Sequence, residues 1–102
     1  MIIYNVTVKV DLDIREAWRR WMREEHIPAV LATGRFTGYQ LCRLLHEEED
    51  GATYAIQYFC PDMATLQQYA ALEAPRLQAQ HRQRFPDRYV AIRTLMEVEE
   101  EG

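Results

Sequence analysis

The chain has 102 residues, 48% of them apolar, with 16 acidic and 12 basic side chains and a net charge of −4. This length fits one domain, and the apolar content excludes an intrinsically disordered chain. The negative charge argues against nucleic acid or an anionic membrane surface as the main partner. No apolar run approaches the roughly 20 residues that a membrane-spanning helix needs, and the N-terminus lacks the basic region of a signal peptide.

Metal and cofactor motifs are not found in the sequence. Cys42 and Cys60 form no C-x-x-C pair, and the histidines and acids show no zinc-ligand spacing. There is no phosphate-binding or dinucleotide-binding glycine motif. We therefore expect no metal and no cofactor, and two reduced, buried thiols in a cytoplasmic protein.

The first third of the chain predicts a strand followed by an amphipathic helix. Residues 2–10 alternate between apolar and polar side chains, as in a half-buried strand. Asp13 and Glu16 have the spacing of a capping box, which predicts the start of the helix. Pro28 predicts a break or kink, and Gly34 a stop. The apolar stripe of this helix consists of Ile14, Ala17, Trp18, Trp21 and Met22.

The remainder predicts three strands and a second helical region. The strands are expected at residues 36–47, 53–60 and 88–98. Residues 48–51 contain the Asp-Gly pair typical of a hairpin turn. Asp62 is the expected N-cap of the second helix, which Pro75 interrupts. Residues 1–98 then form one domain, and residues 99–102 an acidic tail.

The order β-α-β-β-α-β predicts a ferredoxin-like α+β sandwich, with an antiparallel sheet in the order 4-1-3-2 and both helices on one face. We assign Asn5 and Arg93 to the opposite, uncovered face, together with other apolar and aromatic side chains. Soluble monomers avoid such a patch, so we expect this face to pair with a second copy about a two-fold axis. The same topology places His26, at the end of the first helix, at the end of the sheet near Met1.

The segment H-I-P-A-V-L-A-T-G-R-F-T-G-Y, preceded by W-R-R-W-M, resembles a small bacterial family known only as a domain of unknown function. Its members are similar to the dimeric α/β-barrel superfamily, which includes cofactor-free monooxygenases, haem-degrading enzymes, muconolactone isomerases, mutarotases and ligand-binding or regulatory modules. The resemblance implies a fold and a tendency to form homodimers. It does not imply a reaction, because one fold supports many chemistries.

The resemblance also suggests roles for two residues. Mutarotase-like members place a histidine shortly before a proline at the end of the first helix, and His26 is the matching position, in a proton-transfer role. Haem-degrading members use an asparagine on the first strand, which Asn5 matches. Those members also carry a tryptophan and a histidine on the second helix, where this chain has His81 but no tryptophan.

Four residues are candidates for a functional site. His26 has the ordinary pKa range of a general acid or base, or it is a surface histidine at the helix C-terminus. Asn5 binds a ligand or satisfies polar groups in the dimer interface. Arg93 binds a carboxylate or phosphate, or forms an interface ion pair. Tyr58 lines a cavity or packs within the sheet.

Two functions follow from these candidates. The first is a homodimeric small-ligand-binding or regulatory module. The alternative is a cofactor-free isomerase, mutarotase or monooxygenase that acts on a small polar or carboxylated substrate. The alternative requires His26 to face a closed cavity that Asn5 or Arg93 also lines.

Overall fold

The structure, a computed structural model, describes residues 1–46 and 49–102. The second strand, expected over residues 36–47, is shorter in the structure and spans Gly38–Arg43, so its predicted bounds are wrong. Glu47 and the expected start of the hairpin turn at Glu48 lie outside the described residues. The elements in chain order are β1 (Ile2–Val10), η1 (Leu12–Ile14), α1 (Arg15–Trp21), η2 (Met22–His26), α2 (Ile27–Ala32), β2 (Gly38–Arg43), β3 (Ala52–Cys60), α3 (Met63–Leu72), α4 (Ala74–Arg84) and β4 (Tyr89–Glu97).

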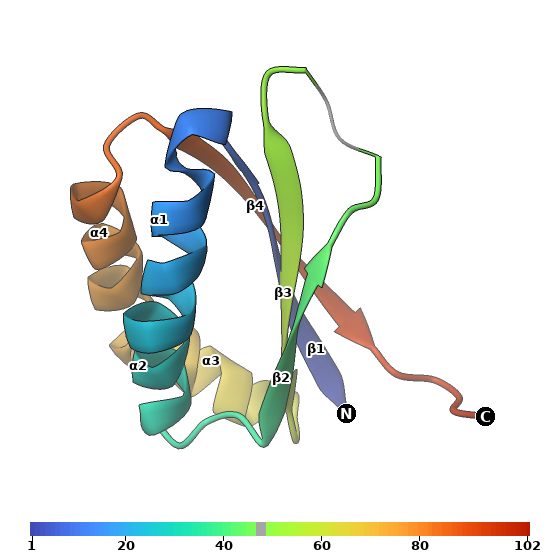
Figure 1. Ribbon diagram of the computed structural model, residues 1–102. Helices are drawn as coiled ribbons and strands as arrows, with labels where there is room; N and C mark the ends of the chain where they lie inside the picture. The colour runs from blue at the N-terminus through green and yellow to red at the C-terminus, as the bar shows by residue number, and fades with distance from the viewer. Residues whose placement is uncertain (47–48) are drawn as a thin grey trace.

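The four strands form one antiparallel sheet in the order β2-β3-β1-β4. Read from the other edge, this order is β4-β1-β3-β2. All the helices lie against one face of the sheet, and the other face is left uncovered (Figure 1). The ferredoxin-like α+β arrangement predicted from the element order is confirmed.

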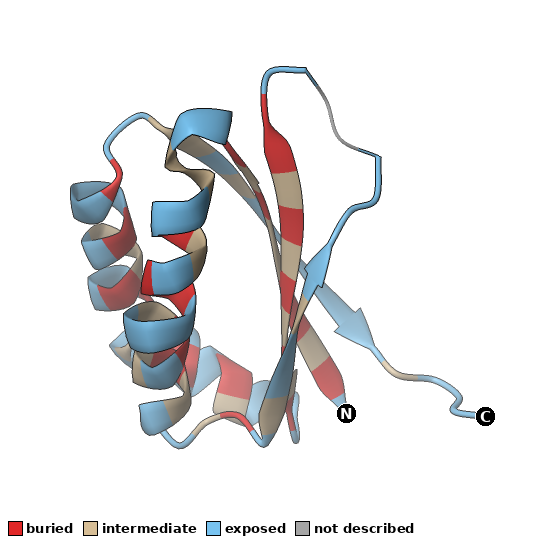
Figure 2. Ribbon diagram, in the orientation of Figure 1, coloured by how far each residue is buried: buried red, intermediate tan, exposed pale blue. Residues whose placement is uncertain are grey.

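The hydrophobic core lies between the sheet and the helices, and the buried residues of β1 and β3 alternate along each strand (Figure 2). On the sheet side, Val8 and Ile56 are 0% and 1% exposed. On the helix side, Trp18, Trp21 and Met22 are buried, as their helical spacing predicted. Tyr4 and Tyr58 pair directly on the same inward face, because facing alternates along a strand.

The first helical region begins differently from the prediction. It starts with the 3-10 helix η1, whose N-cap is Asp11, so the expected capping box at Asp13 is wrong. The Asp13 carboxylate instead accepts a hydrogen bond from the Arg88 guanidinium. Arg88 also donates to Asp11 at 2.8 Å. These ion pairs tie the beginning of the helical region to the beginning of β4.

Pro28 does not end the first helix. The π-helical turn η2 precedes it, and α2 continues with Pro28 in its first turn. A π-helical turn is wider than an α-helical one, which gives the proline ring room against the preceding carbonyls. His26 therefore lies inside a continuous helical segment and not at its end, so the helix C-terminal role suggested for it is wrong. The segment stops at Gly34, where φ is +75°, as predicted.

The second helical region follows the prediction closely. The Asp62 carboxylate accepts a hydrogen bond from the Thr65 backbone N–H at 2.8 Å, which confirms the N-cap. The region divides into α3 and α4, with Pro75 in the first turn of α4. Proline suits a first helical turn because it has no N–H to donate there.

The orientation of β4 corrects the sequence prediction. Arg93 pairs with Val6 of β1, and Leu95 pairs with Tyr4. Directly paired residues share a face, so Arg93 and Leu95 point toward the helices. The assignment of Arg93 to the uncovered face with Asn5 is therefore wrong. The sequence prediction had turned the more apolar side of this strand inward, whereas the structure turns Val90 and Ile92 outward.

Candidate ligand-binding site

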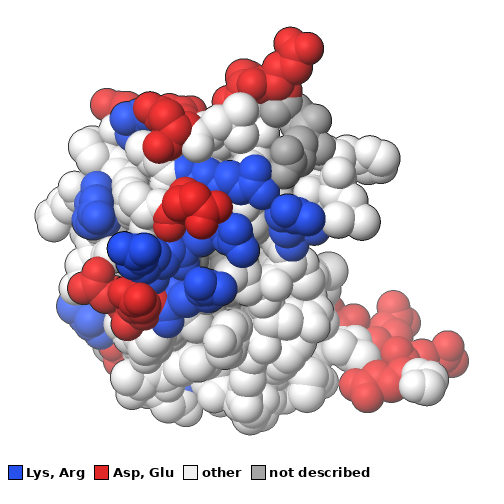
Figure 3. All heavy atoms as spheres, in the orientation of Figure 1, with Lys and Arg blue, Asp and Glu red and all other residues white. Residues whose placement is uncertain are grey.

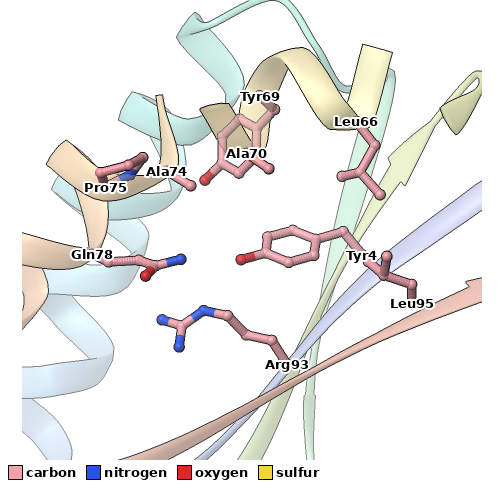
Figure 4. Close-up of a pocket in the computed structure, with 9 residues that line it drawn as sticks. All are labelled: Tyr4, Leu66, Tyr69, Ala70, Ala74, Pro75, Gln78, Arg93 and Leu95. Atoms are coloured by element: carbon pink, nitrogen blue, oxygen red, sulfur yellow. The ribbon is translucent and has the colours of Figure 1, made fainter. Parts of the chain in front are cut away.

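A hollow of about 320 Å³ opens between the second helical region and the β1–β4 side of the sheet (Figure 4). Strand β4 is the edge strand here, so no further strand closes this side. The hollow is at the lower end of the range for small-molecule sites. Its walls are formed by Tyr4, Leu66, Tyr69, Ala70, Ala74, Pro75, Gln78, Arg93 and Leu95.

Four of these side chains bring polar groups into an otherwise apolar space. In Figure 4 the polar ends of Tyr4, Gln78 and Arg93 converge from three elements, and the Tyr69 hydroxyl points toward the same region from α3. The remaining five lining residues offer only apolar side chains. Such a combination of apolar walls and a few convergent polar groups is typical of a small-molecule site.

Arg93 is the only charged side chain among the residues that line this hollow. Within residues 1–46 and 49–102, no hydrogen bond or ion pair engages its guanidinium. The nearby Glu73 carboxylate is already paired with Arg76 at 2.7 Å. The hollow therefore carries an uncompensated positive charge.

A second, smaller chamber of about 20 Å³ adjoins the hollow on its inner side. Tyr4, Tyr69, Gln78 and Arg93 line both spaces. Of these two spaces His26 lines only the inner one, which also has Tyr58 and His81 in its walls. His26 borders a separate surface hollow as well, beside Trp21 and Gln80. The structure thus brings together His26, Arg93 and Tyr58, three of the four residues predicted from the sequence.

The fourth predicted residue, Asn5, lies on the opposite face of the sheet. It pairs with Gln57 and Thr94, on the side that carries no helix. Its amide nitrogen donates to Thr7 Oγ1 at 3.0 Å and to Thr94 Oγ1 at 3.1 Å. Asn5 Oδ1 is buried without a hydrogen-bond partner among the described residues. Asn5 therefore takes no part in the helix-side cavity.

Two histidines and two tryptophans form a packed cluster behind the inner chamber. Trp18 Nε1 donates to His81 Nε2 at 3.0 Å, and His81 stacks on Tyr89 with ring centroids 3.8 Å apart. Trp21 stacks on His26 at 5.0 Å and on His81 at 5.4 Å. His81 is thus held on several sides by neighbouring rings.

Burial keeps both imidazoles neutral. Loss of solvation, with a smaller contribution from the Arg93 charge, lowers the pKa of His26 to about 4. Burial, followed by the charges of His26, Arg93 and Arg82, lowers the pKa of His81 to about 3. A neutral imidazole accepts a proton at one ring nitrogen. His26 Nδ1 is buried and has no hydrogen-bond partner among the described residues.

His81 is poorly suited to bind a metal. Because its Nε2 lone pair accepts the Trp18 N–H, the ring proton lies on Nδ1, and neither nitrogen is left as a ligand. The described part of the chain contains no group of three His, Cys, Asp or Glu side chains placed to hold a metal ion. His81, the second-helix histidine of the haem-degrading pattern, is therefore not available as a haem ligand in this arrangement.

Three polar residues that line the hollow were not predicted as site residues from the sequence: Tyr4, Tyr69 and Gln78. Tyr4 and Tyr69 occupy inward positions of a strand and a helix, where they read as core residues. The hydroxyl groups were the available signal, because a buried phenol needs a hydrogen-bond partner. Gln78 offered no signal, since glutamine on a helix is ordinarily exposed.

Charged side chains elsewhere lie mainly on the outer surface. In Figure 3 basic and acidic groups intermingle on the side where α1 faces the viewer, and the acidic C-terminal tail extends away from the body. One such pair joins Arg19 and Glu16 at 3.2 Å. No helix in the described residues is both long enough and apolar enough to pass through a lipid bilayer.

Residues 1–99 match the model of the family described as Domain of unknown function (DUF4286). Comparison with curated proteins finds no match to this chain.

Similar solved structures share the fold at low sequence identity. HapK from Hahella chejuensis is 14% identical, with a TM-score of 0.72 over 100% of this chain and 96% of that one. The heme-degrader MhuD from Mycobacterium tuberculosis, with two hemes bound in its active site, is 23% identical, with a TM-score of 0.71 over 100% and 99%. A dimeric ferredoxin-like protein from an uncultured marine organism is 6% identical, with a TM-score of 0.73 over 100% and 98%.

The neutral state of His26 predicts a pH dependence of stability. Since its pKa falls from 6.5 in the unfolded chain to about 4 in the folded one, the unfolded state binds more protons between these values. The free energy of unfolding should therefore decrease as the pH falls through this interval. The free energy of unfolding, obtained from urea titrations at several pH values in this interval, should depend less steeply on pH in His26→Gln than in the wild type.

The exposed His46 provides the matched control, and His46→Gln should keep the wild-type slope. An unchanged slope in His26→Gln would show that His26 is solvated in the folded protein.

Proposed function

We propose that this chain, which belongs to the family described as Domain of unknown function (DUF4286), is a small-ligand-binding module that acts as a homodimer. The ligand would occupy the hollow beside Arg93, and the second copy would cover the open face of the sheet. Both cysteines are unpaired, which favours a reducing, cytoplasmic location. Cys60 is buried as expected, whereas Cys42 is exposed, so its predicted burial is wrong.

The uncovered face of the sheet supports the homodimer. Val90, Ile92 and Met96 are 66%, 62% and 40% exposed on this face. Ile3 and Phe59 pair directly beside Met96 and add to the same apolar surface. Exposed apolar patches of this kind are typical of protein interfaces.

The polar groups of this face also suit a partner copy. Within the described strands its only charged side chain is Lys9, which binds Asp50 at 3.0 Å near one end. Asn5 Oδ1 is buried here and accepts no hydrogen bond from the described residues. A second copy, which presents the same amides and hydroxyls, would supply a donor. Closed two-fold pairing is the commonest way to bury such a face.

Ligand binding is carried by one observation: polar ends from β1, β4 and both segments of the second helical region converge on an apolar hollow of about 320 Å³. The structure of the similar MhuD protein holds hemes in its active site, so this fold accommodates ligands in at least one neighbour. The chemistry of His81 argues against a haem here. The occupant we propose is a smaller organic molecule.

One observation favours the enzyme alternative. His26 and Arg93 line the same small chamber, which has room for about one water molecule. Because His26 is neutral, it would accept a proton, through such a water, from a ligand that Arg93 orients in the adjoining hollow. A cofactor-free isomerase, mutarotase or monooxygenase acting on a small polar or carboxylated substrate fits this pair. Product formation that is lost in His26→Gln, while ligand affinity is kept, would favour the enzyme over the binding module.

The homodimer predicts a solution mass of about twice the chain mass of 12.1 kDa in light scattering. Ile92→Lys should shift this mass to that of one chain, because the new charge would be buried in the interface. Leu72→Lys is the control: Leu72 is similarly exposed but lies on a helix, and this variant should remain a dimer. A single-chain mass for the wild type, or a dimeric Ile92→Lys, would contradict the proposal.

Ligand binding is tested by a thermal-shift screen of carboxylates, sugars and other small polar compounds. At least one class should raise the melting temperature, since a ligand that binds only the folded state stabilises it. Ala70→Trp should abolish the shift by filling the mouth of the hollow. Ala71→Trp, on the same helix but outside the hollow, should retain it. No shift with any class, or an Ala70→Trp protein that responds like the wild type, would refute ligand binding in this hollow.

A further inference from the structure

We infer that the ligand of this hollow is a small carboxylic acid with a flat apolar body, whose carboxylate is held by Arg93. The inference rests on the proposed ligand-binding function and adds the chemical class of the ligand. It is argued from the charge, the hydrogen-bonding groups and the wall composition of the hollow.

The charge of the hollow favours an anion, although the Arg93 side chain is also exposed to solvent. Arg93 is the only charged group lining it, and its guanidinium has no hydrogen-bond or ion-pair partner in the described parts of the chain. The Glu73 carboxylate near the mouth is already paired with Arg76. One negative charge on the ligand would balance Arg93. A dianion such as a phosphate monoester would need a second cation, and the lining residues include none.

The hydrogen-bonding groups favour a carboxylate. The guanidinium carries only donors, in a fork that matches two carboxylate oxygens. Burial raises the pKa of Tyr69, so its hydroxyl keeps its proton and can donate. Gln78 of α4 contributes an amide group, and Figure 4 shows this amide on the same side of the hollow as the Arg93 guanidinium. An acceptor with two oxygens satisfies these donors together.

The walls favour an apolar body with few further polar groups. Leu66, Ala70, Ala74, Pro75 and Leu95 offer no hydrogen bonds to a hydroxyl-rich molecule such as a sugar. Burying sugar hydroxyls against them would leave those groups unpaired, which costs free energy. An apolar ring has no hydrogen-bonding groups, so its burial against the same walls would not carry this cost in free energy.

The aromatic residues favour a flat body. Tyr4 packs at a ring-centroid distance of 5.6 Å from Tyr69 and 6.0 Å from Tyr58. Tyr4 and Tyr69 both line the hollow, so a planar ring that enters it meets aromatic surfaces from β1 and α3. Aromatic rings pack favourably in offset or tilted arrangements. The volume of about 320 Å³ suits a molecule of about one ring and its acid group.

The test compares benzoate with benzamide by isothermal titration calorimetry. The two compounds have the same shape, but only benzoate is charged. Benzoate should bind at least about tenfold more tightly, because a hydrogen bond to a charged group is stronger than one to a neutral group. Arg93→Gln should weaken benzoate binding by a similar factor and benzamide binding much less, because only benzoate forms an ion pair with the guanidinium. Arg23→Gln, at an exposed position of η2 outside the hollow, should bind both compounds as the wild type does.

The possible failures separate this inference from the proposed function. Equal affinities for benzoate and benzamide, or an Arg93→Gln protein that keeps its benzoate affinity, would overturn the carboxylate inference. If benzoate does not bind but another class gives a shift that Ala70→Trp abolishes, the ligand-binding function stands and the carboxylate inference falls. If no compound of any class binds in the hollow, both fall.

Discussion

The pairing of β4 with β1 is the constraint on which the candidate site depends. In the observed register Val6 lies opposite Arg93 and Tyr4 opposite Leu95, so Arg93 points toward the helices. A shift of one residue would turn every β4 side chain to the other face. Arg93 would then lie on the open face, and the hollow beside α3 and α4 would lose its only charge. The ion pairs of Arg88 with Asp11 and Asp13 hold the beginning of β4 to the segment that follows β1 and so help to set this register.

The same register gives the two faces of the sheet different side chains. The helix side carries Arg93 and the tyrosine hydroxyls, while the open side carries Val90, Ile92 and the amide of Asn5. Association with a second copy and binding of a small ligand can therefore occur together, because they use opposite sides of β4. Asn5 and Arg93, which the sequence assigned to one face, therefore lie on opposite faces of the sheet.

Much of the fold follows from local rules that the sequence expresses directly. Alternation in residues 2–10, the Asp62 cap, Pro75 and Gly34 predicted their elements well, because each depends on a few neighbouring residues. Two features depended on distant residues and were not predicted. Asp13 binds Arg88 across the fold, which outweighs its tendency to cap a helix. The facing of β4 was inferred from apolarity, which misleads when the more apolar side of a strand is turned away from the core.

The site itself was predicted only in part. Three of the predicted residues were chosen by residue type and do line one chamber: His26, Tyr58 and Arg93. They lie together because the first helical segment continues through Pro28 and because β4 turns Arg93 to the face opposite to the predicted one. Tyr4, Tyr69 and Gln78 become recognisable only when three elements pack together. The measurement that tests this account most directly is a nuclear Overhauser spectrum of the Arg93 side chain. We expect cross-peaks from Arg93 to the Tyr69 ring and the Gln78 amide. Cross-peaks to Ile3 and Asn5 in their place would put Arg93 on the open face and contradict the account.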